Sequence, residues 1–145
     1  MQRLHLHINV GDLEQSIGFY STLFGAEPTV RKPDYAKWML DDPRVNLAIS
    51  SGEGRGIDHV GVQAETAEEL AAIAGRLKSA GQVTFDQKAT TCCYAQSDKS
   101  WVVDPSGLRW ETFHTFGAAT VYGEAEKAAA AAAPVEAAPV AACCG

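Results

Sequence analysis

Three side chains of kinds that bind transition metals stand far apart in the chain: His5, His59 and Glu111. Two imidazoles and one carboxylate on one side of an ion leave coordination positions open, as in non-haem Fe(II) oxygenases. His7 shares a strand face with His5 by alternation and is an alternative first ligand. A strand histidine is also often an ordinary core or surface residue. We expect these donors to hold one divalent metal ion if the fold brings them together.

The four cysteines form two adjacent pairs, Cys92-Cys93 and Cys143-Cys144. Adjacent cysteines cross-link almost no chain, and zinc sites use pairs spaced by two or more residues. An adjacent dithiol is well suited to a soft thiophilic centre such as trivalent arsenic. The alternative for the first pair is two small apolar residues. The second pair lies near the end of the chain and cannot be core, which favours the thiophilic interpretation.

The first half of the chain has the pattern of a strand, a helix and three strands. Residues 3–10 alternate between apolar and polar, which predicts a half-buried strand. Asp12 is placed as an N-cap, with Gln15 completing a capping box, and Gly25 ends the predicted helix. Turn signals then separate short strands expected near 28–32, 35–40 and 45–50.

The second half repeats this plan after a glycine-rich joint. Residues 57–63 predict a strand, Thr66 a helix N-cap, and Gly81 the end of that helix. Four further strands are expected near 83–88, 92–97, 99–103 and 109–114. An offset of 54 aligns His5 with His59 and Asp12 with Thr66, which indicates an internal repeat. This alignment favours His5 over His7 as the first metal ligand.

The predicted fold class is α+β, with two βαβββ modules over residues 3–51 and 57–116 forming one cupped mixed sheet. In such a cup the first strand of each module and the last strand of the second can offer inward ligands. The matching segment of the first module, 45–49, offers no charged or imidazole ligand, which favours an open three-ligand site. We expect one domain over 1–122 and a flexible alanine- and proline-rich tail over 123–145.

Composition excludes several classes of partner. The net charge is −6 and no basic patch is visible, so we expect no nucleic-acid or anionic-membrane partner. No apolar run approaches the roughly 20 residues that span a bilayer. We expect a cytoplasmic protein with reduced thiols. A monomer could complete the site because both modules share one chain, and a homodimer remains an alternative.

The chain resembles the vicinal-oxygen-chelate superfamily of glyoxalases, extradiol dioxygenases and fosfomycin or bleomycin resistance proteins. Three segments support the resemblance: Asp-Leu-Glu-Gln-Ser-Ile-Gly-Phe-Tyr at 12–20, Ile-Asp-His-Val-Gly-Val at 57–62, and Asp-Pro-Ser-Gly-Leu-Arg-Trp-Glu at 104–111. Within the superfamily, the segment Thr-Cys-Cys-Tyr-Ala-Gln-Ser-Asp-Lys-Ser-Trp-Val at 91–102 is most similar to bacterial carbon–arsenic lyases, a group that includes cadmium-induced proteins.

This resemblance implies an Fe(II)- and O2-dependent enzyme that cleaves the carbon–arsenic bond of trivalent organoarsenicals. Methylarsenite and reduced aromatic arsenicals would be substrates, and arsenite the inorganic product. Carried over by motif, Cys92 and Cys93 bind arsenic, while His5, His59 and Glu111 hold the iron. Relatives can have Gln where this chain has His5. Ni, Co or Zn could replace iron in a purified sample.

Lys99 and Tyr94 are candidate catalytic residues that could stabilise charge or lower a cysteine pKa. They could equally be surface or packing residues. The segment 86–98 is expected to form a loop that closes after substrate binds.

Two other functions are weighed against the lyase. A glyoxalase-like metalloenzyme would lack a fourth protein ligand here and would leave both cysteine pairs unexplained. A protein that sequesters cadmium, arsenicals or a drug would need the thiols but not the open metal site. Oxygen-dependent release of arsenite distinguishes the lyase from sequestration.

Overall fold

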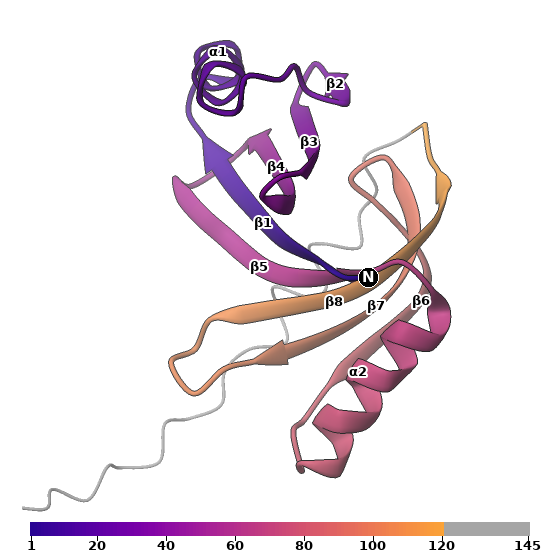
Figure 1. The fold of residues 1–145 in the computed structure, drawn as a ribbon. Coiled ribbons are helices and arrows are strands. Elements are labelled where there is room, and N and C mark those ends of the chain that lie inside the picture. Colours follow the sequence, from indigo (N-terminus) through magenta and orange to yellow (C-terminus); the bar gives the residue numbers. More distant parts are fainter. Residues whose placement is uncertain (121–145) are drawn as a thin grey trace, which may run out of the picture.

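Two copies of one strand–helix–three-strand unit make up residues 1–120, the part of the chain that the computed structural model describes (Figure 1). The first copy contains β1 (Arg3–Val10), α1 (Leu13–Phe24), β2 (Val30–Lys32), β3 (Tyr35–Asp41) and β4 (Arg44–Ser51). The second contains β5 (Gly56–Ala64), α2 (Ala67–Ser79), β6 (Phe85–Cys92), β7 (Ala95–Val103) and β8 (Arg109–Ala118). The predicted α+β fold of two βαβββ modules is confirmed. The predicted tail and its pair Cys143-Cys144 lie outside the described residues.

All eight strands form one curved sheet in the order β2-β3-β4-β1-β5-β8-β7-β6. The modules meet where β1 runs antiparallel to β5, with His5 opposite Gly61 and His7 opposite His59. Within each module the first and last strands are parallel neighbours: β1 pairs with β4, and β5 with β8. The central strands of the sheet are therefore the ones that contain the predicted metal ligands, and Figure 1 shows them side by side.

Both predicted helix starts are confirmed. The carboxylate of Asp12 accepts a hydrogen bond from the backbone N–H of Gln15 at 3.0 Å, and Thr66 Oγ accepts from the N–H of Glu69 at 3.2 Å. Each cap satisfies a backbone donor that lacks a partner inside the helix. Gly25 ends α1 with a φ of 63°, a conformation that glycine adopts without strain.

The helices cover the side of the sheet opposite the candidate metal ligands. Leu13 and Ile17 of α1 pack against buried residues of β3 and β4, including Trp38 and Ile49. Helix α2 buries Leu70 and packs on β5 and β8. Neither helix within residues 1–120 has the length and apolarity needed to cross a membrane. Because apolar packing occupies the helix side, the other face of the sheet remains available for polar side chains.

The region around the first cysteine pair differs from the prediction. Instead of separate strands at 92–97 and 99–103, and a loop over 86–98, β6 and β7 form a hairpin that turns at Cys93 and Tyr94. These two residues have φ values of 54° and 62°. Two-residue hairpin turns of this kind usually contain Asn and Gly, so the segment gives no turn signal in the sequence.

Candidate metal and thiol site

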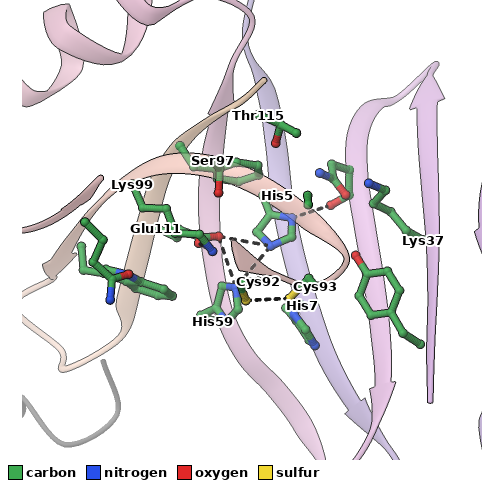
Figure 2. Close-up of a pocket in the computed structure, with 16 residues that line it drawn as sticks. His5, His7, Lys37, His59, Cys92, Cys93, Ser97, Lys99, Glu111 and Thr115 are labelled. Atoms are coloured by element: carbon green, nitrogen blue, oxygen red, sulfur yellow. Dashed lines mark hydrogen bonds and ion pairs between the residues drawn. The ribbon is translucent and has the colours of Figure 1, made fainter. Parts of the chain in front are cut away.

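Side chains from both modules meet in a cavity on the concave face of the sheet (Figure 2). His5 and His7 come from β1, His59 from β5 and Glu111 from β8. All four are buried, with exposed fractions of 6%, 1%, 3% and 3%. Polar groups are buried at a cost unless they have partners, so this cluster needs hydrogen bonds, ion pairs or an ion to stabilise it.

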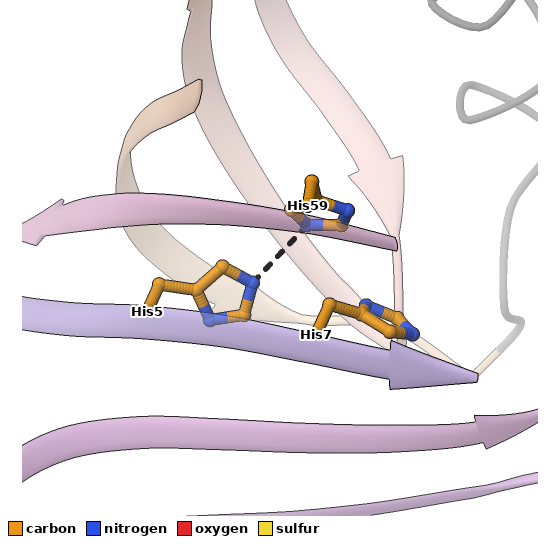
Figure 3. A group of neighbouring side chains, drawn as sticks. All are labelled: His5, His7 and His59. Atoms are coloured by element: carbon orange, nitrogen blue, oxygen red, sulfur yellow. Dashed lines mark hydrogen bonds between the residues drawn. The ribbon is translucent and has the colours of Figure 1, made fainter. Parts of the chain in front are cut away.

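Three donor atoms form a close triangle. Nε2 of His5 lies 3.2 Å from Nε2 of His59, and Oε2 of Glu111 lies 3.7 Å and 3.5 Å from these two nitrogens. Figure 3 shows the two rings directed toward each other from neighbouring strands. An ion bound about 2.1 Å from each donor would separate them by about 3.0–3.4 Å. The triangle therefore fits one divalent ion with little movement, and its three residues line the cavity.

His7 lies close enough to be considered as well. The donor atoms of His5, His7 and His59 lie within 4.8 Å of one another. However, His7 Nε2 is already engaged with Ser50 Oγ at 2.8 Å. The structure thus brings together a three-histidine cluster and the predicted two-histidine, one-carboxylate set. The second set has the closer donors and includes a negative charge, so we favour it for a divalent ion.

The imidazoles of His5 and His59 each have a hydrogen-bond acceptor at Nδ1, the ring nitrogen that faces away from the triangle. His59 Nδ1 lies 2.7 Å from Oδ2 of Asp58, and His5 Nδ1 lies 3.0 Å from the carbonyl oxygen of Asn46. A carboxylate and a carbonyl only accept, so both Nδ1 atoms donate and each Nε2 is directed at the triangle. Arg109 binds Asp58 at 3.2 Å and fixes it in turn. Such outer partners are typical of histidines that ligate metals.

Lys99 and Glu111 form a buried ion pair beside the triangle. Nζ of Lys99 lies 2.6 Å from Oε1 of Glu111, and the lysine is 8% exposed. Burial opposes ionisation of Glu111, but the charge of Lys99 outweighs it and holds the carboxyl pKa well below its usual range. Burial also opposes the charge on Lys99, whose pKa is nevertheless raised because Glu111 and Cys92 lie nearby. Glu111 is therefore an anion, with Oε2 left to face the two imidazoles.

The three histidines differ in charge state. Burial lowers the pKa of His5 to about 4 and that of His7 to about 3, so both rings are neutral at neutral pH. Burial acts in the same direction on His59, but the carboxylates of Asp58 and Glu111 outweigh it and raise its pKa to about 9. A metal ion would have to displace one proton from His59, since only a neutral nitrogen can be a ligand.

Gly61 permits the close approach of β8 that positions Glu111. A Cβ at Gly61 would lie 2.2 Å from the carbonyl oxygen of Glu111, far inside van der Waals contact. Gly61 also lies opposite His5 in the sheet and adds no side chain to the cavity there. Its lack of a side chain therefore serves both strand packing and space for the ligands.

The first cysteine pair lines the same cavity. The two sulfurs lie 3.0 Å apart, longer than a disulfide bond, and Cys92 is 4% exposed while Cys93 is half-buried. Cys92 ends β6 and Cys93 begins the hairpin turn (Figure 2). The strained backbone of the turn thus holds two thiols next to each other and on the same cavity as the metal donors.

Of the two predicted catalytic residues, Lys99 lies in the cavity and Tyr94 does not line it. The Tyr94 hydroxyl donates to Asp34 at 2.7 Å, and the ammonium of Lys32 lies 5.2 Å from the centre of its ring. Asp34 and Lys32 belong to the first module. Tyr94 therefore fastens the tip of the hairpin to the opposite module, across the cavity.

Sequence reasoning missed Asp58, Lys37 and Asn46. Asp58 directly precedes a candidate ligand, and that adjacency was a usable signal for an outer partner. Lys37 and Asn46 also line the cavity, from β3 and β4. Neither has a local pattern that separates it from ordinary strand residues, so only the sheet register reveals them.

Comparison with protein-family models identifies the class of protein to which this fold belongs. Residues 2–112 match the model of the Glyoxalase/Bleomycin resistance protein/Dioxygenase superfamily, and the chain belongs to this family.

Two relatives within this family are similar in sequence over most of the chain. A protein of Bacillus sp. (strain MD1) named trivalent organoarsenical cleaving enzyme is 45% identical over 119 residues, covering 79% of this chain and 74% of its own length. Cadmium-induced protein CadI of Mycobacterium tuberculosis (strain ATCC 25618 / H37Rv) is 42% identical over 125 residues, covering 85% and 82% of the two chains.

A solved structure shares the fold. Homoprotocatechuate 2,3-dioxygenase from Arthrobacter globiformis superposes with a TM-score of 0.60 at 20% identity. The match covers 85% of this chain and 38% of the dioxygenase chain. At this identity the likeness concerns the fold alone.

Proposed function

We propose that this protein cleaves the carbon–arsenic bond of trivalent organoarsenicals, using one Fe(II) held by His5, His59 and Glu111, with O2 as co-substrate. Arsenic would be captured by Cys92 and Cys93. The observation that carries the proposal is that the donor triangle and the two thiols line one cavity. The name of the Bacillus relative supports the choice of substrate class, and the family membership supports a metal-dependent reaction.

Capture by the dithiol is balanced chemistry. Each thiol gives up its proton, a sulfur–arsenic bond replaces an arsenic–hydroxyl bond, and the proton and hydroxide leave as one water. Two such exchanges hold the arsenic with its organic group still attached. The ion, when bound, would supply the oxygen chemistry that breaks the carbon–arsenic bond. Fixing the arsenical on a cavity wall beside the ion supplies proximity, which is a large part of any rate enhancement.

The chain's own residues prepare both parts of the site. Lys99 neutralises one oxygen of Glu111, leaves the other for the metal, and stands near Cys92, where a positive charge favours the thiolate. Asp58 orients His59. Lys99 is thus a positioning residue that supports both the metal side and the thiol side. Reduced thiols would require a reducing compartment, and the cytoplasm provides one.

Sequestration is the second candidate, because two adjacent thiols can bind a soft ion without any turnover. The mycobacterial relative is named for its induction by cadmium, itself a soft thiophilic metal. The ordered donor triangle favours the lyase, since thiol capture alone does not need two oriented imidazoles and a carboxylate.

The test is release of arsenite from methylarsenite by the Fe(II)-loaded protein, in air and under nitrogen. We expect release in air only, and we expect the Cys92→Ser/Cys93→Ser variant to lose release while it keeps its metal. The matched control is Cys143→Ser/Cys144→Ser, which removes as many thiols and should lower capture at low substrate without abolishing turnover. Full activity of the Cys92→Ser/Cys93→Ser variant, or tight binding with no release, would overturn the lyase proposal.

A further inference from the structure

Lys37 lines the cavity from the first module. It lies on β3 opposite Ala48 of β4, and Ala48 in turn lies opposite His7 of β1. Lys37 is thus two strands from His7, a backbone separation of about 10 Å. Its side chain lines the same cavity as the donor triangle and the thiols (Figure 2). The cavity therefore contains the ammonium group of Lys37 in addition to the donor triangle and the thiols.

The ammonium of Lys37 has no carboxylate within ion-pair distance among residues 1–120. Lys99, the other lysine of the cavity, has its ion pair with Glu111. Lys37 is half-buried, and this partial burial lowers its pKa, with only the nearby Cys93 acting in the opposite direction. A desolvated cation without a counter-ion gains more from an anionic ligand than a fully hydrated one does.

Asn46 adds an acceptor to the same wall. It is 3% exposed, and its Nδ2 donates to Oε1 of Gln63 at 2.9 Å. This bond fixes the amide, whose Oδ1 is buried and receives no hydrogen bond from residues 1–120. Buried polar atoms nearly always have partners, so a ligand that donates to Oδ1 would relieve a real cost.

The residue between these groups is small. Ala48 is 1% exposed and lies on the strand between Lys37 and His7, and its side chain is only a methyl group. A larger side chain at Ala48 would separate the lysine from the metal side. Lys37 and the two cysteines line one cavity, so an organic group held at the thiols could reach toward Lys37.

We propose that Lys37 and Asn46 form a subsite for an aromatic arsenical whose ring bears an oxygen anion, such as a carboxylate or a phenolate. The inference rests on the proposed function. Because capture by two thiols removes both hydroxyls from arsenic, the organic group is the only part of the substrate left to recognise. The ring oxygen accepts from the Lys37 ammonium, and a neighbouring hydroxyl or amine donates to Asn46 Oδ1. Methyl and unsubstituted phenyl groups make neither contact.

The test compares the dissociation constants of phenylarsenite and 4-carboxyphenylarsenite, both trivalent, by calorimetry under nitrogen, where no turnover occurs. We expect the wild-type protein to bind the carboxylated compound about tenfold more tightly, as one charge-assisted hydrogen bond predicts. Lys37→Met should remove this preference and leave phenylarsenite binding unchanged, and Lys37→Arg should keep most of it. Lys78→Met removes a lysine of α2 that pairs with Asp86 and should change neither constant.

Two outcomes would overturn the subsite. One is equal affinity of the wild-type protein for both compounds. The other is an equal loss of affinity for both compounds in Lys37→Met, which would mean that the lysine acts on the Cys93 thiol and not on the ring. Failure of the proposed function looks different: neither arsenical would bind through Cys92 and Cys93, and Cys92→Ser/Cys93→Ser would match the wild type.

Discussion

The carboxylate of Glu111 is shared, because Oε1 lies 2.6 Å from Nζ of Lys99 while Oε2 lies 3.5 Å from Nε2 of His59. One oxygen is neutralised by a buried ammonium and the other faces the donor triangle. Because Glu111 contacts both, the candidate metal ligands and the ion pair with Lys99 form one connected network. Stability, metal binding and protonation of the site are consequently linked.

Removing the lysine should destabilise the metal-free protein. Lys99→Met keeps most of the side-chain volume but leaves Glu111 as a buried anion, and losing one partner of a buried pair costs about 3–5 kcal/mol. Urea denaturation of the metal-free protein measures the loss. The double variant Lys99→Met/Glu111→Gln removes both charges and should recover a large part of it. Equal stability of Lys99→Met and wild type would mean that the pair is not formed.

The two histidines of β1 should differ in their effect on metal content. His5→Ala, His59→Ala and Glu111→Ala each remove a corner of the triangle and should leave less than a tenth of the bound Fe(II). His7→Ala should keep most of it, because His7 Nε2 is engaged with Ser50. Elemental analysis after anaerobic loading and desalting gives the answer. The reverse order, with His7→Ala empty and His5→Ala loaded, would assign the site to His7.

The metal-free protein should be most stable near pH 6.5. As pH falls from 6.5 toward 4, the unfolded chain takes up protons on His5 and His7 while the folded protein does not, so the free energy of unfolding falls. As pH rises from 6.5 to 9, the unfolded chain releases the His59 proton while the folded protein keeps it, so stability falls again. Each proton contributes a slope of about 1.4 kcal/mol per pH unit.

Urea denaturation across this pH range tests whether the free energy of unfolding has a maximum near pH 6.5. His7→Gln should flatten the acid side and leave the alkaline side unchanged. A steady rise of stability from pH 6.5 to 9 would show that His59 is not protonated in the folded protein.

Replacing one exposed alanine of the hairpin with glycine should stabilise the protein. Ala89 has a φ of 48°, a left-handed conformation that costs an alanine about 1 kcal/mol relative to glycine. Ala89→Gly should therefore raise the free energy of unfolding by up to about 1 kcal/mol. The control is Ala72→Gly in the exposed part of α2, which should lower it by about as much. Thermal denaturation distinguishes the two, and destabilisation by both would contradict the strained conformation at Ala89.

The contact between Tyr94 and Asp34 should restrict access to the thiols. Tyr94→Phe removes the hydroxyl that joins the hairpin tip to the first module. We expect a severalfold faster reaction of Cys93 with a thiol reagent such as DTNB, with secondary structure unchanged by circular dichroism. To isolate the first cysteine pair, the assay uses the Cys143→Ser/Cys144→Ser background for both proteins. An unchanged rate would mean that the tip opens equally well with the hydroxyl in place.

Local sequence was sufficient for much of the fold. Asp12 and Thr66 predict their helix starts because a capping side chain acts over three residues. The offset between His5 and His59 corresponds to a module that occurs twice in the structure. The same repeat pointed to His5 and His59 as candidate ligands, and the last strand of the second module supplied Glu111 as the third. Their convergence within a few ångströms was an expectation that depended on how the modules pair, and the pairing of β1 with β5 accounts for it.

Other parts were beyond local patterns. Cys93 and Tyr94 adopt positive φ without a glycine or asparagine, so the hairpin turn was hidden and two strands were predicted where β7 is continuous. The roles of Lys37 and Gly61 depend on which residues lie opposite them on neighbouring strands. Register is a property of the whole sheet, and single-chain periodicity does not contain it.

The boundary between β1 and β5 runs through the donor triangle, with His5 on one side and His59 and Glu111 on the other. An ion bound there would link two halves that have the same order of elements. One module alone does not contain all three donors, so the oxygen chemistry proposed for the cavity depends on the pairing of both modules. A substitution that shifts the register between β1 and β5 would therefore disturb the metal site as well as the sheet.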